Sequence, residues 1–160
     1  MDIRIGNGYD THPLVDGETL ILGGVNINHY KGTRGHSDGD VLIHAIMDSL
    51  LGAANLGDIG KYFPSNSSDY KNISSLVLLE KVNEMIYKQS YSILNIDSTI
   101  LLQKPMLKDY ILSMKKQIDK ILLIGIDKIS IKATTNDKLG FIGQEKGISV
   151  ISTALLKKNI

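Results

Sequence analysis

Residues 35–45, GHSDGDVLIHA, mark the point where the chain changes from strand-like to helix-like patterning. Before them, residues 2–9 (DIRIGNGY) alternate like a strand, and residues 19–29 (TLILGGVNINH) predict a strand pair that bends at its two central glycines. After them, one helix face is predicted up to a stop near Gly52. The residues that form this face are Val41, Leu42, Ala45, Ile46, Ser49 and Leu50.

The same stretch matches the G-x-S-x-G pattern of a nucleophile elbow through Gly35, Ser37 and Gly39. A serine hydrolase of that kind needs a strand before the serine, and an acid and then a histidine after it. No strand pattern precedes Ser37, and His44 is the only histidine that follows it. We therefore expect Ser37 to cap the helix, with Asp40 completing a capping box.

The rest of the chain continues to mix helix and strand patterns. In chain order these are a loop at 57–70, a helix at 74–88, a strand at 91–103, a helix at 108–120, a strand at 128–135 and a strand or helix at 147–156. This mixture predicts an α+β (α/β two-layer) fold.

Composition narrows the class of protein. A chain of 160 residues fits one domain, 1–160. The net charge of +1 gives no general attraction to nucleic acid or to an acidic membrane, so we expect neither as a partner. Because the chain has no cysteine, a bound metal must use His, Asp, Glu and other oxygen donors. No signal peptide or membrane-length apolar run is evident in the sequence, which favours an intracellular protein.

A metal site is one interpretation of three polar residues. Asp10 and His12 are two positions apart, so both point to one face of an extended strand. His44 lies in the first part of the predicted helix, where Asp40, one turn earlier, could orient its ring. Two imidazoles and one carboxylate suit Zn²⁺ with a fourth position left open. The alternative, a satisfied structural histidine on a helix, is also open.

Two further segments allow a functional and a plain interpretation. KATTNDKLGF (132–141) follows a strand, so its amides, hydroxyls and lysines could hold phosphate, although it lacks the Gly-Lys-Ser/Thr of a P-loop. An ordinary polar turn would look the same. Asp58 could bind a sugar hydroxyl or cap a short helix.

Taken together, five motifs resemble those of the 2-C-methyl-D-erythritol 2,4-cyclodiphosphate synthase family. In order they are IGNGYDTH (5–12), ILGGVNI (21–27), GHSDGDVLIHA (35–45), GAANLGDIGKYFP (52–64) and IKATTNDKLGFIG (131–143). They cover nearly the whole chain. The resemblance implies a mixed four-stranded sheet with helices packed on one face, assembling as a homotrimer with active sites at the subunit interfaces.

The resemblance also implies a reaction and its cofactors. The substrate is 4-diphosphocytidyl-2-C-methyl-D-erythritol 2-phosphate, whose 2-phosphate attacks the β-phosphorus and releases CMP. The nucleophile belongs to the substrate, so the protein positions it and neutralises charge. The implied cofactors are Zn²⁺ and a second ion, Mg²⁺ or Mn²⁺. The implied location is cytoplasmic in a bacterium, or a plastid-type organelle if the chain is a processed form.

Site residues follow from the resemblance by position. Asp10, His12 and His44 correspond to the zinc ligands, with a β-phosphate oxygen as the fourth, and Asp137 to the carboxylate for the second ion. His36 and Thr135 correspond to the catalytic pair. The residues implied to bind substrate are Asp10, His12, His36, Ser37, Asp58, Ile59, Gly60, Phe63, Thr134, Thr135, Asn136, Asp137 and Phe141. The loop implied to bind cytidine is Leu102, Gln103, Lys104, Pro105, Met106, Leu107 and Lys108.

The chain departs from the family pattern at a few positions. Asp137 stands where the family usually has Glu, and Ser65 and Ser67 where many members have Asp. Gln144 replaces an Arg at the trimer axis and Lys146 a Glu, which puts an isoprenoid diphosphate site there in doubt. Two other functions therefore stay open beside the cyclase: a metal-dependent phosphohydrolase that uses water as nucleophile, and a non-catalytic trimeric binding protein.

Overall fold

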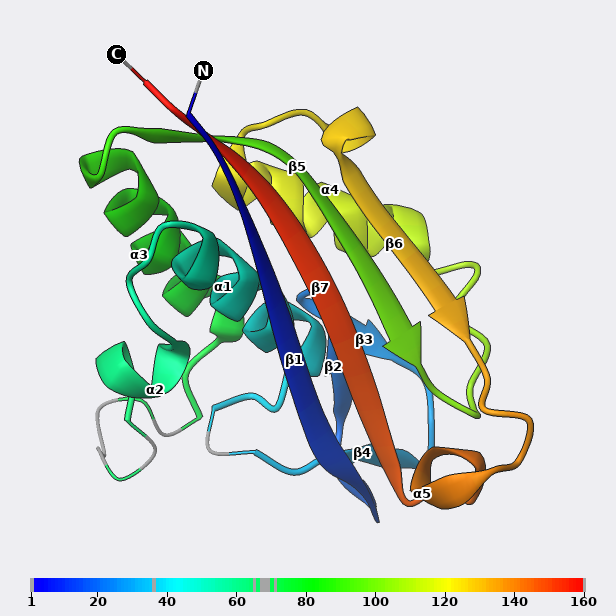
Figure 1. Cartoon of the computed structure of the whole chain (residues 1–160). Coiled ribbons are helices and arrows are strands. Elements are labelled where there is room, and N and C mark those ends of the chain that lie inside the picture. The colour runs from blue at the N-terminus through cyan, green and yellow to red at the C-terminus, as the bar shows by residue number, and fades with distance from the viewer. Residues whose placement is uncertain (1, 36, 65, 67–69, 71, 160) are drawn as a thin grey trace.

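The computed structural model describes residues 2–35, 37–64, 66, 70 and 72–159 (Figure 1). The predictions made for His36, Ser65 and Ser67 lie outside these residues. The strands are β1 (Ile3–Asp16), β2 (Leu20–Leu22), β3 (Val25–Ile27), β4 (Lys31–Thr33), β5 (Tyr91–Leu101), β6 (Ile129–Thr134) and β7 (Gly147–Lys158). The helices are α1 (Val41–Ala53), α2 (Ile59–Tyr62), α3 (Ser75–Lys88), α4 (Ile111–Leu122) and α5 (Gly140–Gly143), with a short 3-10 turn at Ile126–Lys128.

The main sheet has five strands in the order β4-β1-β7-β5-β6. β4, β1, β7 and β5 are antiparallel neighbours, whereas β5 and β6 are parallel, so the sheet is mixed as expected. The expected number of four strands is wrong. The fifth, β4, pairs only three residues with the end of β1, from Leu14 opposite Thr33 to Asp16 opposite Lys31. A three-residue strand containing Gly32 has no alternating pattern by which the sequence could reveal it.

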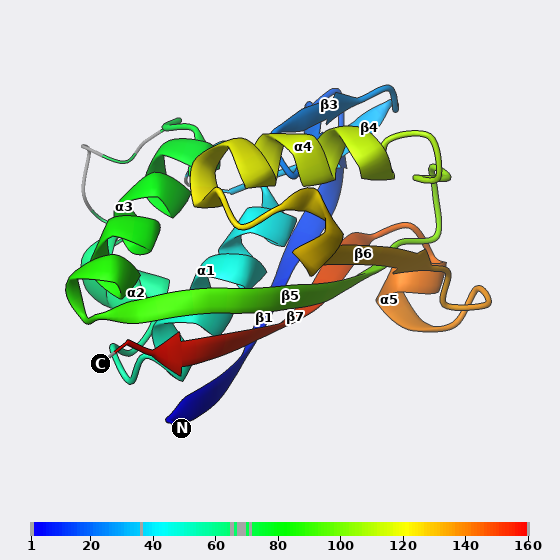
Figure 2. The same cartoon turned by 90° about the horizontal axis from the view of Figure 1, so that it is seen from above.

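The long helices form one layer against one face of this sheet. Figure 2 shows α1, α3 and α4 on the same side of β1, β7 and β5. The core between the layers is apolar, and α1 contributes most to it because almost all of its residues are buried. Within the described residues, no helix is long and apolar enough to cross a membrane.

Two glycines of β1 let α1 lie directly on the strand. A Cβ atom on Gly6 would come within 2.1 Å of the Ser49 carbonyl oxygen, and one on Gly8 within 2.0 Å of the Ala45 carbonyl oxygen. No side chain fits such a gap. Because side chains alternate along a strand, Asp10 and His12 point to the same helix-covered face as these glycines. The close contact therefore places both residues beside the first turns of α1.

The start of α1 differs from the prediction. The helix begins at Val41, and its N-cap is Asp40, whose side chain accepts the N–H of Ile43. The prediction that Ser37 caps the helix is therefore wrong. The segment 147–156, expected to be either a strand or a helix, is part of strand β7. The strand expected at 2–9 is longer than predicted and extends to Asp16.

Candidate metal centre and substrate pockets

Asp10, His12 and His44 meet where β1 passes the first turn of α1. Asp10 Oδ2 lies 2.8 Å from His12 Nε2 and 3.0 Å from His44 Nδ1. One ligand atom from each of the three residues lies within 4.8 Å of the other two. The structure thus brings together the three residues that the sequence assigned to zinc.

The electrostatics of the group favour a cation. Burial opposes ionisation of Asp10, but hydrogen bonds from His12 and His44 outweigh it and lower the pKa of Asp10 to about 2. Burial likewise opposes the charged form of His44, yet the neighbouring carboxylates, Asp10 first, raise the pKa of His44 above its usual value. Asp10 is thus a carboxylate at neutral pH, and both imidazoles lie against it.

The hydrogen bonding of His12 fits a metal ligand. Its Nδ1 lies 3.1 Å from the carbonyl oxygen of Arg34, which can only accept a hydrogen bond. Nδ1 therefore carries a proton, and Nε2, which faces Asp10, is the nitrogen that can give up its proton to bind an ion. Two imidazole nitrogens and a carboxylate oxygen form a donor set that suits Zn²⁺, so the residues present fit the expected ion.

A second group of polar side chains lies on the far side of the His44 ring. Nε2 of His44 is 2.9 Å from Ser37 Oγ and 3.1 Å from Ser75 Oγ. Ser75 in turn donates its hydroxyl to Asp38 Oδ1 at 2.5 Å and its backbone N–H to Asp38 Oδ2 at 2.8 Å. Sequence analysis missed Asp38 and Ser75; the only signals were a second aspartate in GHSDGD and a serine pair before a predicted helix.

Asp40 was expected to orient the His44 ring, but its side chain binds backbone N–H groups instead. It is completely buried, and besides Ile43 it accepts the backbone N–H groups of Gly23 at 3.0 Å and Gly24 at 2.7 Å. Burial raises its pKa to about 6, against the opposing effect of these hydrogen bonds. Asp40 thus joins the β2–β3 turn to α1, and no described hydrogen bond links it to the His44 ring.

A pocket of about 260 Å³ opens over the metal ligands. Its lining includes Asp10, His12, Ser37 and His44 from the centre, and Ile59, Gly60, Phe63, Tyr70 and Leu78 from the surrounding elements. The expected contacts Ile59, Gly60 and Phe63 are therefore next to the candidate metal centre. Asp58 is not among the lining residues; it caps α2 by accepting the N–H of Lys61 at 3.1 Å.

A separate pocket of about 230 Å³ lies across the sheet from the metal ligands, where β5 and β6 end. It brings the expected cytidine loop together with the end of β6. The lining residues are Leu102, Gln103, Pro105, Met106, Leu107, Lys108, Ile111, Ala133, Thr134 and Thr135. Lys104 is the member of the loop that faces elsewhere, since its ammonium group pairs with Glu145 at 3.2 Å.

The turn after β6 carries the residue expected to bind the second ion. Asp137 and Lys138 both have positive φ angles, of 48° and 63°. The side-chain oxygen of Gln103 accepts the N–H groups of Asn136 at 3.3 Å and Lys138 at 3.2 Å, and so ties this turn to the cytidine loop. Phe141, nearby in α5, packs against Gly147.

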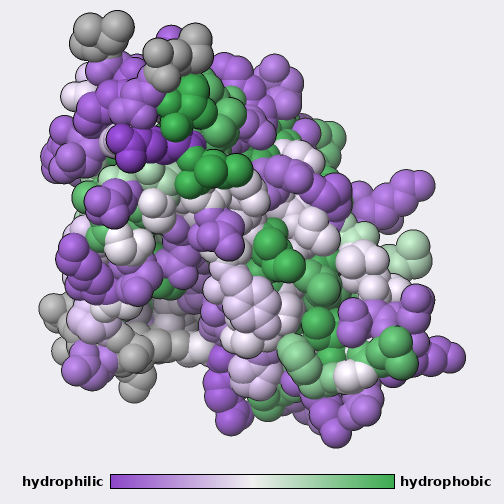
Figure 3. Space-filling model, in the orientation of Figure 1, coloured by the Kyte–Doolittle hydropathy of each residue, from purple (hydrophilic) through white to green (hydrophobic). Residues whose placement is uncertain are grey.

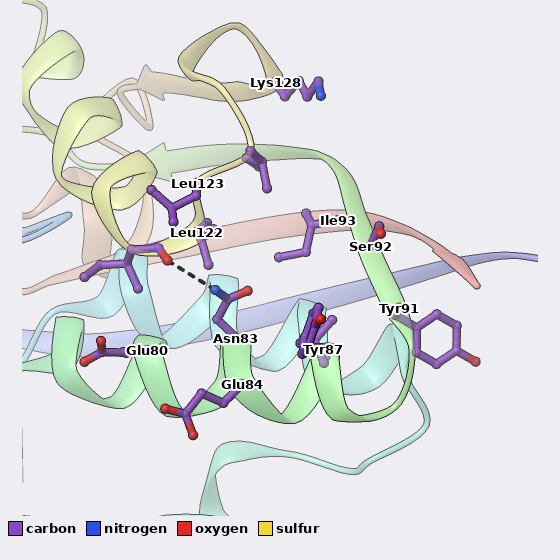
Figure 4. A pocket seen from close by; sticks show the side chains of 13 residues that line it. Glu80, Asn83, Glu84, Tyr87, Tyr91, Ser92, Ile93, Leu122, Leu123 and Lys128 are labelled. Carbon is purple, nitrogen blue, oxygen red and sulfur yellow. Dashed lines mark hydrogen bonds between the residues drawn. The ribbon is translucent and has the colours of Figure 1, made fainter. Parts of the chain in front are cut away.

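The largest described cleft, about 510 Å³, lies between α3, the start of β5 and the end of α4 (Figure 4). It contains none of the predicted site residues. Its Asn83 side chain already donates to the Ile121 carbonyl oxygen at 3.2 Å. Predicted site residues instead line the two smaller pockets described above.

The fold and the site define an α+β protein with a candidate two-histidine, one-carboxylate metal centre and a second, separate ligand pocket. The YgbB family model matches residues 3–157, and the chain belongs to this family. Two relatives, both named 2-C-methyl-D-erythritol 2,4-cyclodiphosphate synthase, confirm the resemblance inferred from the motifs. The relative from Clostridium botulinum (strain Okra) is 56% identical over 96% of this chain and 99% of its own, and that from Fusobacterium nucleatum is 51% identical over 98% of both.

Solved structures of proteins with the same fold support this family assignment. The Plasmodium falciparum IspF in complex with CDP has a TM-score of 0.85 and 40% identity, over 98% of this chain and 97% of that chain. The bifunctional IspDF from Campylobacter jejuni has a TM-score of 0.95 and 40% identity over 99% of this chain. This chain spans only 43% of the Campylobacter protein.

Proposed function

We propose that this chain converts 4-diphosphocytidyl-2-C-methyl-D-erythritol 2-phosphate to 2-C-methyl-D-erythritol 2,4-cyclodiphosphate and CMP, as one domain spanning residues 1–160. An oxygen of the 2-phosphate attacks the β-phosphorus, and the bond from that phosphorus to the oxygen bridging it to the α-phosphate breaks. The observation that carries the proposal is the cluster of Asp10, His12 and His44 in a chain 56% identical to a relative named for this synthase.

The metal-site pocket is proposed to hold the erythritol and β-phosphate part of the substrate. A divalent cation such as Zn²⁺, held by Asp10, His12 and His44, would supply positive charge that neutralises phosphate oxygens. Phe63 and Ile59 line this pocket, and their apolar side chains would limit the access of water to the β-phosphorus. Ser37, whose hydroxyl contacts His44 Nε2, lines the same pocket and is proposed to bind the methylerythritol phosphate.

The second pocket is proposed to hold the cytidine. Its lining combines apolar residues such as Leu107 with the hydroxyl-bearing Thr134 and Thr135, which are proposed to lie beside the phosphates. Thr135 and His36, which lies outside the described residues, are the proposed catalytic pair. Asp137, with Asn136 beside it, is proposed to hold Mg²⁺ or Mn²⁺ against the diphosphate. The relative solved with CDP supports a nucleotide here, since its fold matches along almost the whole chain.

The two pockets share no lining residue, which supports a site assembled from neighbouring chains. The sheet face turned away from the helices is a suitable interface for a homotrimer. It carries the exposed apolar side chains of Ile3, Ile5, Tyr9 and Ile151. Figure 3 views the molecule from the side of this face, and green apolar side chains are visible there among polar ones.

Phosphorus NMR of the full chain with the cytidylyl substrate, Zn²⁺ and Mg²⁺ tests the proposal. We expect equal amounts of CMP and a cyclic diphosphate. CMP with a linear phosphate product would mean that water attacks the β-phosphorus, and the chain would be a phosphohydrolase. No turnover by a zinc-loaded trimer would leave a binding protein.

The His44→Ala variant tests the role of the metal centre. We expect a loss of turnover and of bound zinc while the oligomer persists, because His44 supplies one of three ligands. Full activity of a zinc-free His44→Ala protein would exclude the proposed chemistry.

A further inference from the structure

Asp38, Ser75 and His44 form a chain of hydrogen bonds, and its geometry determines which atom is the donor in each bond. Asp38 sets the direction of this chain, because its two carboxyl oxygens face backbone N–H groups, which can only donate. Its Oδ1 lies 2.5 Å from Ser75 Oγ and 3.2 Å from the N–H of Asp40, and its Oδ2 lies 2.8 Å from the N–H of Ser75. Every partner of Asp38 here is a donor. The Ser75 hydroxyl must therefore give its single proton to Asp38.

The donor in the next hydrogen bond, between Ser75 and His44, follows from this. With its proton on Asp38, Ser75 Oγ has only lone pairs to offer to the imidazole nitrogen 3.1 Å away. His44 Nε2 must then be the donor, because two lone pairs facing each other in a buried site repel. Ser75 is completely buried and the His44 side chain is only 10% exposed, so water cannot easily take over either bond.

Ser37 does not determine this direction. Its hydroxyl lies 2.9 Å from the same Nε2 and 3.4 Å from Ser75 Oγ, and it can give its proton to either of these two atoms. Ser37 can therefore adapt to either tautomer of His44. Ser75 is different because a carboxylate lies behind it.

We propose that Asp38 and Ser75 are positioning residues that keep a proton on Nε2 of His44, so that Nδ1, the nitrogen that faces Asp10, is the one that gives up its proton to bind the ion. The inference rests on the proposed metal site. The ring has to present one particular nitrogen, since Nδ1 is the one 3.0 Å from Asp10. His12 is held in the complementary way by the Arg34 carbonyl oxygen, so each imidazole has its own acceptor on the side away from the ion.

Ser75→Ala in the full chain is the main test, since it removes the hydroxyl and keeps the backbone N–H that Asp38 also holds. Zinc affinity is measured by competition with a chelating dye, with zinc alone and no substrate. We expect it to fall about 10–100-fold, the usual effect of losing a hydrogen-bond partner behind a metal ligand. Asp38→Asn, which replaces an acceptor by a donor at equal size, should weaken zinc binding in the same direction.

Ser74→Ala is the matched control. Ser74 is the neighbouring serine and caps α3 by accepting the N–H of Leu76, but no described contact joins it to His44. This variant should lose some stability and keep the zinc affinity of the parent protein. A loss of affinity as large as that of Ser75→Ala would reduce the role of Ser75 to helix stability and overturn the proposal.

Proton–nitrogen correlation spectra of the zinc-loaded protein give a second readout that helix stability does not affect. We expect His44 Nε2 to carry a slowly exchanging proton in the parent and in Ser74→Ala, and a rapidly exchanging one in Ser75→Ala. A proton on Nδ1 with the ion on Nε2, or no zinc binding by the parent, would overturn the inference. Normal zinc binding and spectra without any cyclic product would instead exclude only the proposed reaction.

Discussion

At the scale of single residues, the candidate metal centre is a carboxylate shared by two imidazoles. Asp10 lies within 3.0 Å of a nitrogen of both His12 and His44, so the site is already organised as a charged cluster before any ion is bound. A bound cation has to replace a proton on one of these nitrogens. Zinc binding and proton binding therefore compete directly.

The pH dependence of zinc affinity follows from this competition. Although burial acts against it, the carboxylates around His44 raise its pKa above 6.5. Below that raised pKa, release of one proton per ion should weaken apparent zinc affinity about tenfold per pH unit. Chelator competition between about pH 5 and pH 8 measures the slope. An affinity that stays constant down to the ordinary histidine pKa would contradict the expectation.

The metal-free protein should show the same linkage in its stability. A raised pKa of His44 means that the folded state holds this proton more tightly than the unfolded state. The resulting stabilisation is complete below 6.5, the unfolded value, and is lost as the pH rises through the folded pKa. His29 serves as an internal control in an NMR titration, because burial lowers its pKa and it should lose its proton first.

Gln103 is a residue whose side chain joins two parts of the proposed nucleotide site. Its oxygen accepts two N–H groups of the turn that carries Asp137. Gln103→Leu removes both bonds, each worth about 1 kcal/mol, so CDP affinity measured by calorimetry with Mg²⁺ should fall by up to about 30-fold. Gln103→Glu keeps the acceptor and should retain most of the affinity. Equal losses in both variants would show that the amide group itself contacts the ligand.

At the scale of elements, the sequence predicted what periodicity can encode. The strand at 91–103 and the helix at 74–88 match β5 and α3 closely, because each has the full pattern of a long element. β4 and α5 were not predicted, since three or four residues contain no period to detect. α2 was foreseen only as the plain interpretation of Asp58.

The candidate site was also predictable only where a local sequence pattern indicates it. Asp10 and His12 share a strand face by simple alternation, and His44 was grouped with them as one open interpretation, which the resemblance to a family then favoured. Asp40 could not be assigned correctly, because its bonds to Gly23 and Gly24 join segments that are adjacent only in the folded chain. Ser75 reaches His44 across 31 residues for the same reason.

The contact between β1 and α1 gives a prediction at this scale. Gly8→Ala would place a methyl group 2.0 Å from the backbone oxygen of Ala45, where neither element can yield. We expect the free energy of unfolding to fall by about 3 kcal/mol, the upper range for overpacking a core. Urea unfolding of the metal-free protein measures it, so that zinc linkage does not contribute.

Gly52→Ala is the control for this variant. Gly52 is also in the β1–α1 region, but the nearest atom to its added Cβ is the Asn7 oxygen at 3.8 Å. An alanine in a helix is favoured over glycine by about 1 kcal/mol, so this variant should be at least as stable as the parent. Similar losses in both variants would mean that helix propensity, and not the close contact, determines the effect.

At the scale of the whole molecule, the sheet separates two surfaces with different tasks. Helices cover one face of the sheet (Figures 1 and 2), and strand alternation directs Asp10 and His12 to that face. Ile5 and Ile151 are exposed on the opposite face. The proposed nucleobase pocket and metal pocket share no lining residue. Assembly through the uncovered face is the proposed way to bring complementary pockets of neighbouring chains together.

A charge on that face should therefore dissociate the assembly. Ile5 is 73% exposed in the single chain, and Ile5→Glu would replace an apolar contact worth about 2 kcal/mol by a carboxylate that loses its water on burial. Sedimentation equilibrium should give a trimer for the parent and a monomer for the variant. Tyr87→Glu is the control, since Tyr87 is 78% exposed but lies on α3, in the helix layer. The monomer should still bind zinc through Asp10, His12 and His44. It should lose cyclisation, because each chain then has only its own two separate pockets. If Ile5→Glu remained trimeric and active, the interface would have to lie on another surface.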